Sequence, residues 1–134
     1  MYEYFFFYGT LRFGCPISTI ILKNAKYITS ISLPGSLYLS DDKYPVYVPE
    51  NTGVVIGDIF KVPSNLIPHL DEYEDINSDY TPYKRVQMEK NNLKFWIYTA
   101  NNSFLKNLSM YKKIPSGDWL KYYKKRYVLM KKHI

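Results

Sequence analysis

The chain is poor in the residues that build covalent or metal-held frameworks. Its 134 residues include one cysteine, Cys15, and two histidines, His69 and His133. A single cysteine excludes an internal disulfide and is typical of a reducing compartment. One cysteine and two histidines also fall short of the ligand clusters found in metal sites, so we expect no metal.

Long apolar runs and nucleotide-binding motifs are missing as well. No stretch approaches the ~18 consecutive apolar residues of a membrane helix. The start of the chain has no basic region before its apolar run, so we expect neither a signal peptide nor a membrane partner. There is no Walker loop, Rossmann fingerprint or Gly-x-Ser-x-Gly elbow. We therefore expect a cytoplasmic protein that uses no cofactor.

Positive charge is abundant but confined to one end. The formal net charge is +6, and the residues before the last 16 carry equal numbers of basic and acidic side chains. The six basic residues that follow the last acid, Asp118, are Lys121, Lys124, Lys125, Arg126, Lys131 and Lys132. A basic segment from about residue 119 on a neutral body does not favour nucleic-acid binding, although binding of an acidic partner through this tail stays open.

The tail also has an apolar side. Leu120, Tyr123, Tyr127 and Met130 recur at helical spacing, with lysines between them. This spacing predicts a helix from Trp119 whose apolar face packs on the body while the lysines stay solvated.

Short strands and short helices alternate along the rest of the chain. Aromatic and β-branched runs predict strands over residues 2–8, 25–32, 36–39, 44–48, 54–60, 83–88 and 93–100. Pro16 opens one short helix, and Ser64 or Asn65 caps a second that runs to about Tyr73. This mixture predicts an α+β protein, with a small curved sheet or barrel flanked by helices, in one domain spanning residues 1–134.

Glycine and proline positions carry more specific expectations. Gly9 ends the first strand, and we expect it to take backbone angles that other residues resist and to expose N–H groups that bind an anion. Pro45 suggests an edge strand, and Gly57 marks a bulge or a close packing contact. A hairpin turn is expected at Glu89–Asn92.

An acidic cluster follows the second helix. Residues 70–75, Leu-Asp-Glu-Tyr-Glu-Asp, hold four carboxylates. Repulsion and burial would raise the pKa of the least solvated carboxyl, which then suits a general base that later acts as an acid. A solvated acidic helix face is the alternative interpretation.

Cys15 precedes a predicted helix N-terminus, a position that can lower the pKa of a thiol. A cysteine nucleophile usually needs a partner histidine, and the sequence places neither His69 nor His133 beside it. We interpret Cys15 as an incidental small residue and His69, among apolar neighbours, as structural.

Six stretches together resemble the γ-glutamylcyclotransferase-like family, which includes γ-glutamylamine cyclotransferases and avirulence-induced-gene-like proteins. In chain order they are Phe7–Gly14, Gly35–Tyr38 with Tyr44-Pro45, Gly57–Phe60 with Leu70–Glu74, Tyr83–Arg85, Trp96–Tyr98 and Ser116–Trp119. Each stretch alone is a weak signal, but six in the family's order are specific. The similarity runs from about Tyr4 to Trp119.

The resemblance implies a small mixed β-barrel with short flanking helices and a pocket at one mouth. It implies that Glu74 is the catalytic acid/base. It also implies that Tyr8, Gly9, Thr10 and Leu11 form the substrate-binding loop. We add Arg85 and Tyr98 to the expected substrate-binding set. Arg85 would pair with a substrate carboxylate, although an arginine on a strand is as often a structural ion-pair partner. The implied substrate is a small γ-glutamyl compound.

Two positions depart from the family pattern. Asp75 stands where a glycine often follows the glutamate, directly beside the implied catalytic residue. Asp42-Lys43 stands where a glycine is common before Tyr44-Pro45, in a loop. We expect Glu74, alone among the acids of residues 71–75, to point into the pocket beside the 9–11 loop.

The implied reaction is a cyclisation of a γ-glutamyl amide or amine to 5-oxoproline. The substrate's own α-amine attacks its γ-carbonyl, so one carboxylate that moves protons is sufficient. A non-catalytic domain that binds a small metabolite on the same scaffold is the alternative, because a fold does not fix a function. The sequence does not indicate the amine or the oligomeric state.

Overall fold

A computed structural model describes residues 1–41 and 43–124 of the chain. The strands are β1 (Tyr2–Phe7), β2 (Lys26–Pro34), β3 (Ser36–Ser40), β4 (Tyr44–Val48), β5 (Val54–Pro63), β6 (Tyr83–Lys90) and β7 (Leu93–Ala100). The helices are α1 (Pro16–Ile21), α2 (Ile67–Tyr73) and α3 (Asn102–Lys106), with single 3-10 turns at Ser64–Leu66 and Leu108–Met110. Residues 119–124 are also helical. No helix in the described ranges is long and apolar enough to cross a bilayer.

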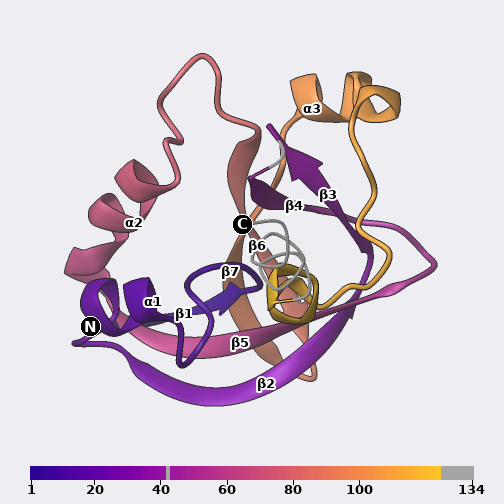
Figure 1. Ribbon diagram of the computed structural model, residues 1–134. Helices are drawn as coiled ribbons and strands as arrows, with labels where there is room; N and C mark the ends of the chain where they lie inside the picture. Colours follow the sequence, from indigo (N-terminus) through magenta and orange to yellow (C-terminus); the bar gives the residue numbers. More distant parts are fainter. Residues whose placement is uncertain (42, 125–134) are drawn as a thin grey trace, which may run out of the picture.

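One mixed sheet curls into a half-barrel, which agrees with the predicted α+β class and curved sheet. Its strand order is β2-β5-β1-β7-β4-β3, and β6 pairs with β7 outside this path. The long strands β2 and β5 curve along one side, and β3 and β4 lie on the other (Figure 1). Helices α1 and α2 lie side by side, and Ile17, Ile67 and Leu70 share one core cluster with Phe5 and Phe7.

The sheet divides at β7. The antiparallel partner β6 follows β7 along its whole length, from Tyr83↔Ala100 to Lys90↔Leu93. The other edge of β7 is shared by two parallel strands: β1 pairs at Phe5↔Trp96 and β4 at Tyr47↔Thr99. Because a strand has only two edges, β1 and β4 must separate from each other along β7, which leaves a fork in the sheet.

The fork corrects the prediction for Pro45. The strand β4 lies between β7 and β3, so it is not an edge strand. It meets β7 only near Tyr47, and Pro45 lies before that point, where the side facing β7 is open. A residue without an N–H is tolerated there because no ladder bond is required.

Other local predictions are refined in the same way. The hairpin turn between β6 and β7 is only Asn91-Asn92, both at positive φ (53° and 66°), a combination that asparagine tolerates in tight hairpins. Gly57 marks close packing, because a Cβ there would overlap the Phe6 ring. Neither Ser64 nor Asn65 caps α2, whose preceding residue Leu66 makes no side-chain cap. The short helix α3 was not predicted.

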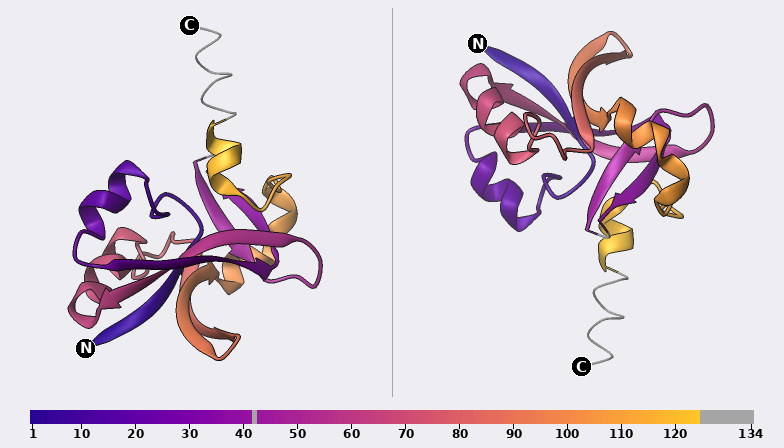
Figure 2. Two further views of the ribbon diagram at one scale, coloured as in Figure 1. Left: turned by 90° about the horizontal axis from the view of Figure 1, so that it is seen from below. Right: turned by 90° about the horizontal axis from the view of Figure 1, so that it is seen from above.

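The predicted C-terminal helix is confirmed as far as Lys124. It leaves the body on one side of the sheet (Figure 2), and Trp119, 2% exposed, belongs to the largest core cluster. Leu120 packs against the same cluster, as predicted. The prediction is wrong for Tyr123, which is 52% exposed, and Tyr122 packs against the cluster instead. Tyr127 and Met130, which the spacing also assigned to this face, lie outside the described residues.

Truncation of the buried indole should unfold the protein more easily. We expect Trp119→Ala to lower the free energy of unfolding by about 3–5 kcal/mol, the usual cost of removing a buried tryptophan. Met110→Ala, at a residue that is 79% exposed, serves as the control in the same urea titration. An unchanged midpoint for Trp119→Ala would show that the segment does not pack on the body.

Candidate functional site

A cavity of about 490 Å³ opens beside the fork. The loop after β1, the adjoining ends of β3 and β4, and the C-terminal end of α2 form most of its wall. The remainder comes from residues 80–82, the start of β6 and Tyr98 of β7. Residues far apart in the sequence therefore meet at one opening in the sheet.

The Tyr8 side chain bridges the fork. Its hydroxyl donates to the carbonyl oxygen of Tyr98 (2.6 Å) on β7 and accepts from the N–H of Tyr47 (3.1 Å) on β4. Burial raises the pKa of this phenol, which therefore stays protonated and able to donate. Both hydrogen-bonding directions of the hydroxyl are used by the backbone, so Tyr8 shapes the floor of the cavity.

The loop after β1 lines the cavity with Gly9, Thr10 and Leu11. Their N–H groups make no hydrogen bond to another described residue. The Leu11 side chain packs into the core, and the Thr10 hydroxyl lies 3.1 Å from that of Tyr73. The loop thus offers a wall of unused backbone donors, the arrangement that stabilises an oxyanion or a carboxylate.

The prediction that Gly9 takes unusual backbone angles is wrong. The glycines with positive φ among the described residues are Gly14, Gly35 and Gly53. A Cβ on Gly9 would lie 3.1 Å from the Cγ of Pro45 at the start of β4. The contact is tight because the loop crosses close to β4, so a larger residue would require the Pro45 ring to shift.

A buried ion-pair network, which was not predicted, fixes the far end of this loop. Asp58 on β5, 2% exposed, accepts hydrogen bonds from the Phe13 N–H (2.8 Å), the Ser30 hydroxyl (2.7 Å) and Arg12 Nε (3.3 Å). Arg12 also donates to Asp118 (3.0 Å). The sequence motif contains Arg12 and Asp58, but their pairing spans 46 positions and has no local signal.

The acidic end of α2 closes the cavity on another side. Glu74 is the C-cap residue of α2, directly after its last residue Tyr73, and Asp75 follows it with a positive φ of 58°. The N–H groups of Asp75 and Ile76 donate to the carbonyls of Glu72 and Asp71, which is the Schellman pattern of helix termination. Asp75 occupies the left-handed position that glycine prefers, so the departure from the family pattern is a backbone adjustment that aspartate tolerates.

The Glu74 carboxylate lines the cavity without a partner. It forms neither a hydrogen bond nor an ion pair with any side chain of the described residues. Removal from water raises the pKa of this carboxyl from its ordinary 4.5 to about 7. Tyr8, Tyr73, Tyr83 and Tyr98 surround it: burial raises the pKa of each of these phenols, and the charge of Glu74 raises each further.

The raised pKa of Glu74 agrees with the prediction for an unpaired carboxyl, but Glu74 is not the only acid at the cavity. Glu72 and Asp75 line it as well, although both are exposed. Helix α2 ends at Tyr73, so helical geometry does not turn Asp75 away from the cavity, and Glu72 lines it from the last turn of the helix. What distinguishes Glu74 is its removal from water.

Two residues of the predicted substrate-binding set have partners within the protein. Arg85 pairs with Asp71 through Nε–Oδ1 (2.8 Å) and Nη2–Oδ2 (3.2 Å), and it lies 4.4 Å over the Trp96 ring. It is not among the described residues that line the cavity. Tyr98 does line the cavity, and its hydroxyl donates to Asp71 (2.7 Å). Contact of either residue with a substrate stays a prediction.

Cys15 lies away from this site. It precedes α1, but burial raises the pKa of its thiol, with a smaller lowering by Arg12. It is not among the cavity-lining residues in the described part of the chain. A thiol that stays protonated near neutral pH is a poor nucleophile, in agreement with its interpretation as an incidental residue.

The family model described as gamma-glutamyl cyclotransferase, AIG2-like, matches residues 5–121. The chain belongs to this family. The matched residues include the loop after β1, the acidic end of α2 and both strands of the β6–β7 hairpin. The resemblance stated from the six motifs is thereby confirmed. No curated protein matches the sequence.

Solved structures share the fold. A crystal structure of an uncharacterised protein from Pyrococcus horikoshii is 22% identical, with a TM-score of 0.69, and the match covers 93% of this chain and 96% of that one. Protein ytfP from Escherichia coli is 25% identical, with a TM-score of 0.65, and the match covers 88% of this chain and 96% of that one. An AIG2-like protein from Mus musculus is 21% identical, with a TM-score of 0.58, and the match covers 78% of this chain and 82% of that one. The predicted α+β fold, a small mixed barrel with short flanking helices, is therefore confirmed, and its sheet is curled into a half-barrel.

Removal of the charge from Asp58 should loosen the Gly9–Leu11 loop. We expect Asp58→Asn to lower the free energy of unfolding by about 3 kcal/mol, because it leaves a buried arginine without the more deeply buried of its two counter-charges. Asp118→Asn, whose carboxylate is more exposed (28% against 3%), should cost about 1 kcal/mol. Equal losses for the two variants, measured by urea denaturation, would contradict this assignment.

The unpaired Glu74 carboxyl should also make the free energy of unfolding depend on pH. The pKa of Glu74 is higher in the folded state than in the unfolded chain, so folding takes up a proton between about pH 4.5 and 7. Stability from this group is therefore full below pH 4.5 and is lost as the pH rises through 7. Glutamine does not ionise, so Glu74→Gln does not lose stability as the pH rises. Above pH 7 its free energy of unfolding should exceed that of the parent by about 2–3 kcal/mol.

The matching measurement is urea denaturation of both proteins at several pH values from 4 to 8. The difference between them should grow as the pH rises and level off above 7. A difference that does not change with pH would mean that Glu74 titrates as an ordinary exposed glutamate.

Proposed function

We propose that this protein is a γ-glutamyl cyclotransferase that converts a γ-glutamyl amide or amine into 5-oxoproline and a free amine, with Glu74 as the general acid/base. The observation that carries the proposal is the position of Glu74. It is an unpaired, desolvated carboxylate that lines the same cavity as the Gly9–Leu11 loop, whose N–H groups have no partner among the described residues. Family membership supports the same class of reaction.

The reaction needs only proton transfers and charge stabilisation. The neutral α-amine of the glutamyl group attacks its own γ-carbonyl carbon, and a C–N bond closes the five-membered ring. The attacking nitrogen gives one proton to the Glu74 carboxylate. The Glu74 carboxyl then gives that proton to the departing nitrogen as the original amide bond breaks. Atoms and charge balance without a covalent intermediate on the protein.

The pKa of Glu74, about 7, suits both transfers. A group whose pKa lies near the working pH is basic enough to take a proton and acidic enough to return it. The tyrosines around the carboxylate keep it from bulk water without placing a cation beside it. A salt bridge to a lysine or arginine would lower the pKa and weaken the base.

The loop after β1 would bind the oxygen on which charge develops. The N–H groups of Gly9, Thr10 and Leu11 are available for the tetrahedral oxyanion and for the glutamyl α-carboxylate. Because Asp58 and Arg12 hold the end of this loop, its donors are fixed before the substrate arrives. Holding the substrate in a folded conformation makes the attack intramolecular, which contributes several kcal/mol to the rate.

Release of 5-oxoproline from a panel of γ-glutamyl amides and amines tests the proposal. We expect Glu74→Gln to lower kcat by about 100-fold or more, the usual effect of losing a general acid/base, while the fold is retained. Glu89→Gln changes an exposed carboxylate on the β6 hairpin and serves as the control. Near-normal turnover by Glu74→Gln would support the scaffold alternative, a cavity that binds a metabolite without converting it.

A further inference from the structure

We propose that the amine released by this protein carries a positive charge and no carboxylate, so that its substrates are γ-glutamyl derivatives of cationic amines. The inference rests on the proposed cyclisation and adds the chemical class of the leaving group. It comes from the charge and the aromatic content of the cavity wall, neither of which the proposed reaction requires.

The cavity wall is acidic. Four carboxylates of the described residues line it: Asp41, Glu72, Glu74 and Asp75. No lysine, arginine or histidine is among the lining residues in the described part of the chain. The whole chain has a formal net charge of +6, so this local excess of negative charge runs against the composition.

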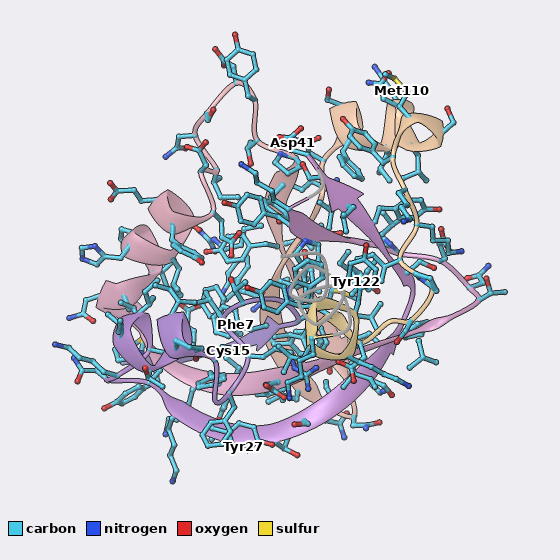
Figure 3. All side chains as sticks on the ribbon, viewed as in Figure 1. Phe7, Cys15, Tyr27, Asp41, Met110 and Tyr122 are labelled. Carbon is cyan, nitrogen blue, oxygen red and sulfur yellow. The ribbon has the colours of Figure 1, made fainter. Side chains whose placement is uncertain are left out.

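Three of these carboxylates lie at the mouth and on two sides of it. Asp41, Glu72 and Asp75 are exposed, whereas Glu74 is partly buried. Asp41 lies at the end of β3, across from α2 (Figure 3), and Glu72 and Asp75 lie at the end of α2. A glutamyl group held between Glu74 and the Gly9–Leu11 loop directs its leaving group outward, between these acids.

A leaving group with its own carboxylate would meet only like charges at the mouth. A γ-glutamyl amino acid brings two carboxylates, one on each half. The unused N–H groups of Gly9, Thr10 and Leu11 are available to the carboxylate of the glutamyl half. The outer half finds no cation among the described lining residues, so a second carboxylate is disfavoured and an ammonium group is favoured.

Exposed aromatic rings at the mouth favour the same class. Tyr44 (55% exposed), Tyr73 (41%) and Tyr80 (94%) all line the cavity, although tyrosine usually buries most of its ring. The face of a tyrosine ring attracts an ammonium group, and its edge offers apolar contact to the methylene chain that carries it. Carboxylates and tyrosine faces together form a site suited to an alkyl ammonium.

Three matched substrates separate charge from size. They are the γ-glutamyl amides of diaminopropane, n-butylamine and β-alanine, which place an ammonium, a methyl or a carboxylate at nearly the same distance from the scissile bond. We expect kcat/KM for 5-oxoproline release to be at least about tenfold higher for the diaminopropane compound than for the butylamine compound. This follows because each exposed ion pair contributes a factor of about 1.5–5. The β-alanine compound should be the poorest substrate.

Variants at the mouth assign the preference to these residues. Asp41→Asn and Glu72→Gln should each narrow the ratio of the diaminopropane to the butylamine compound by about two- to fivefold. Asparagine suits position 41, where φ is 50°, so the backbone is preserved. Glu89→Gln, away from the cavity, should leave the ratio unchanged. High salt should narrow the ratio for the parent protein, because it screens exposed charges.

The outcomes separate this inference from the proposed function. Preference for the diaminopropane compound, narrowed by both mouth variants, supports the inference. Equal turnover of all three compounds, or preference for the β-alanine compound, overturns it while the cyclisation itself stands. Absence of 5-oxoproline from all three compounds and from the wider panel overturns both.

Discussion

The fork in the sheet is the constraint on which the cavity depends. Strands β1 and β4 share one edge of β7, and the Tyr8 hydroxyl joins the two branches through Tyr98 and Tyr47. Without this bridge, an open ladder of N–H and C=O groups would face the interior, and each unsatisfied group costs about 1–3 kcal/mol. One phenol therefore satisfies the backbone at the fork and leaves room for the cavity.

The electrostatics of the site divide the acids of α2 into different roles. Asp71 has three hydrogen bonds to the side chains of Arg85 and Tyr98, so its charge is fully compensated. Glu74, three residues later, has no such partner and is removed from water. The folded protein thus contains an unfavourable carboxylate, that of Glu74, close in sequence to a compensated one, that of Asp71. An ionisable side chain without a partner is typical of functional sites, where a reactive group often lowers the stability of the fold.

Much of the fold could be predicted because its signals are local. Aromatic and β-branched runs identified all seven strands, and Pro16 marked the start of α1. The residues of the site were named through the family motifs, and Glu74 and the Gly9–Leu11 loop are brought to one cavity. The periodicity of the tail indicated a packed helix; in the described part Leu120 packs on the core as predicted, whereas Tyr123 is exposed.

The features that were missed or mistaken depend on long-range contacts. The tight space beside Gly9 comes from the crossing of β4, where Pro45 lies 36 residues further along the sequence. The Arg12–Asp58 pair and the fork each join segments that are far apart in the sequence, so local sequence patterns do not reveal them. The acids at the cavity mouth, Asp41 and Glu72, come from β3 and α2, so their joint presence appears only in three dimensions.

The central claim is that Glu74 is a desolvated carboxyl with a pKa near 7, and its titration can be observed directly. The side-chain carboxyl carbon of Glu74, assigned by its loss in Glu74→Gln, should change its NMR chemical shift with a midpoint at about pH 7 in the ligand-free protein. A midpoint near 4.5, the ordinary value for glutamate, would contradict the account.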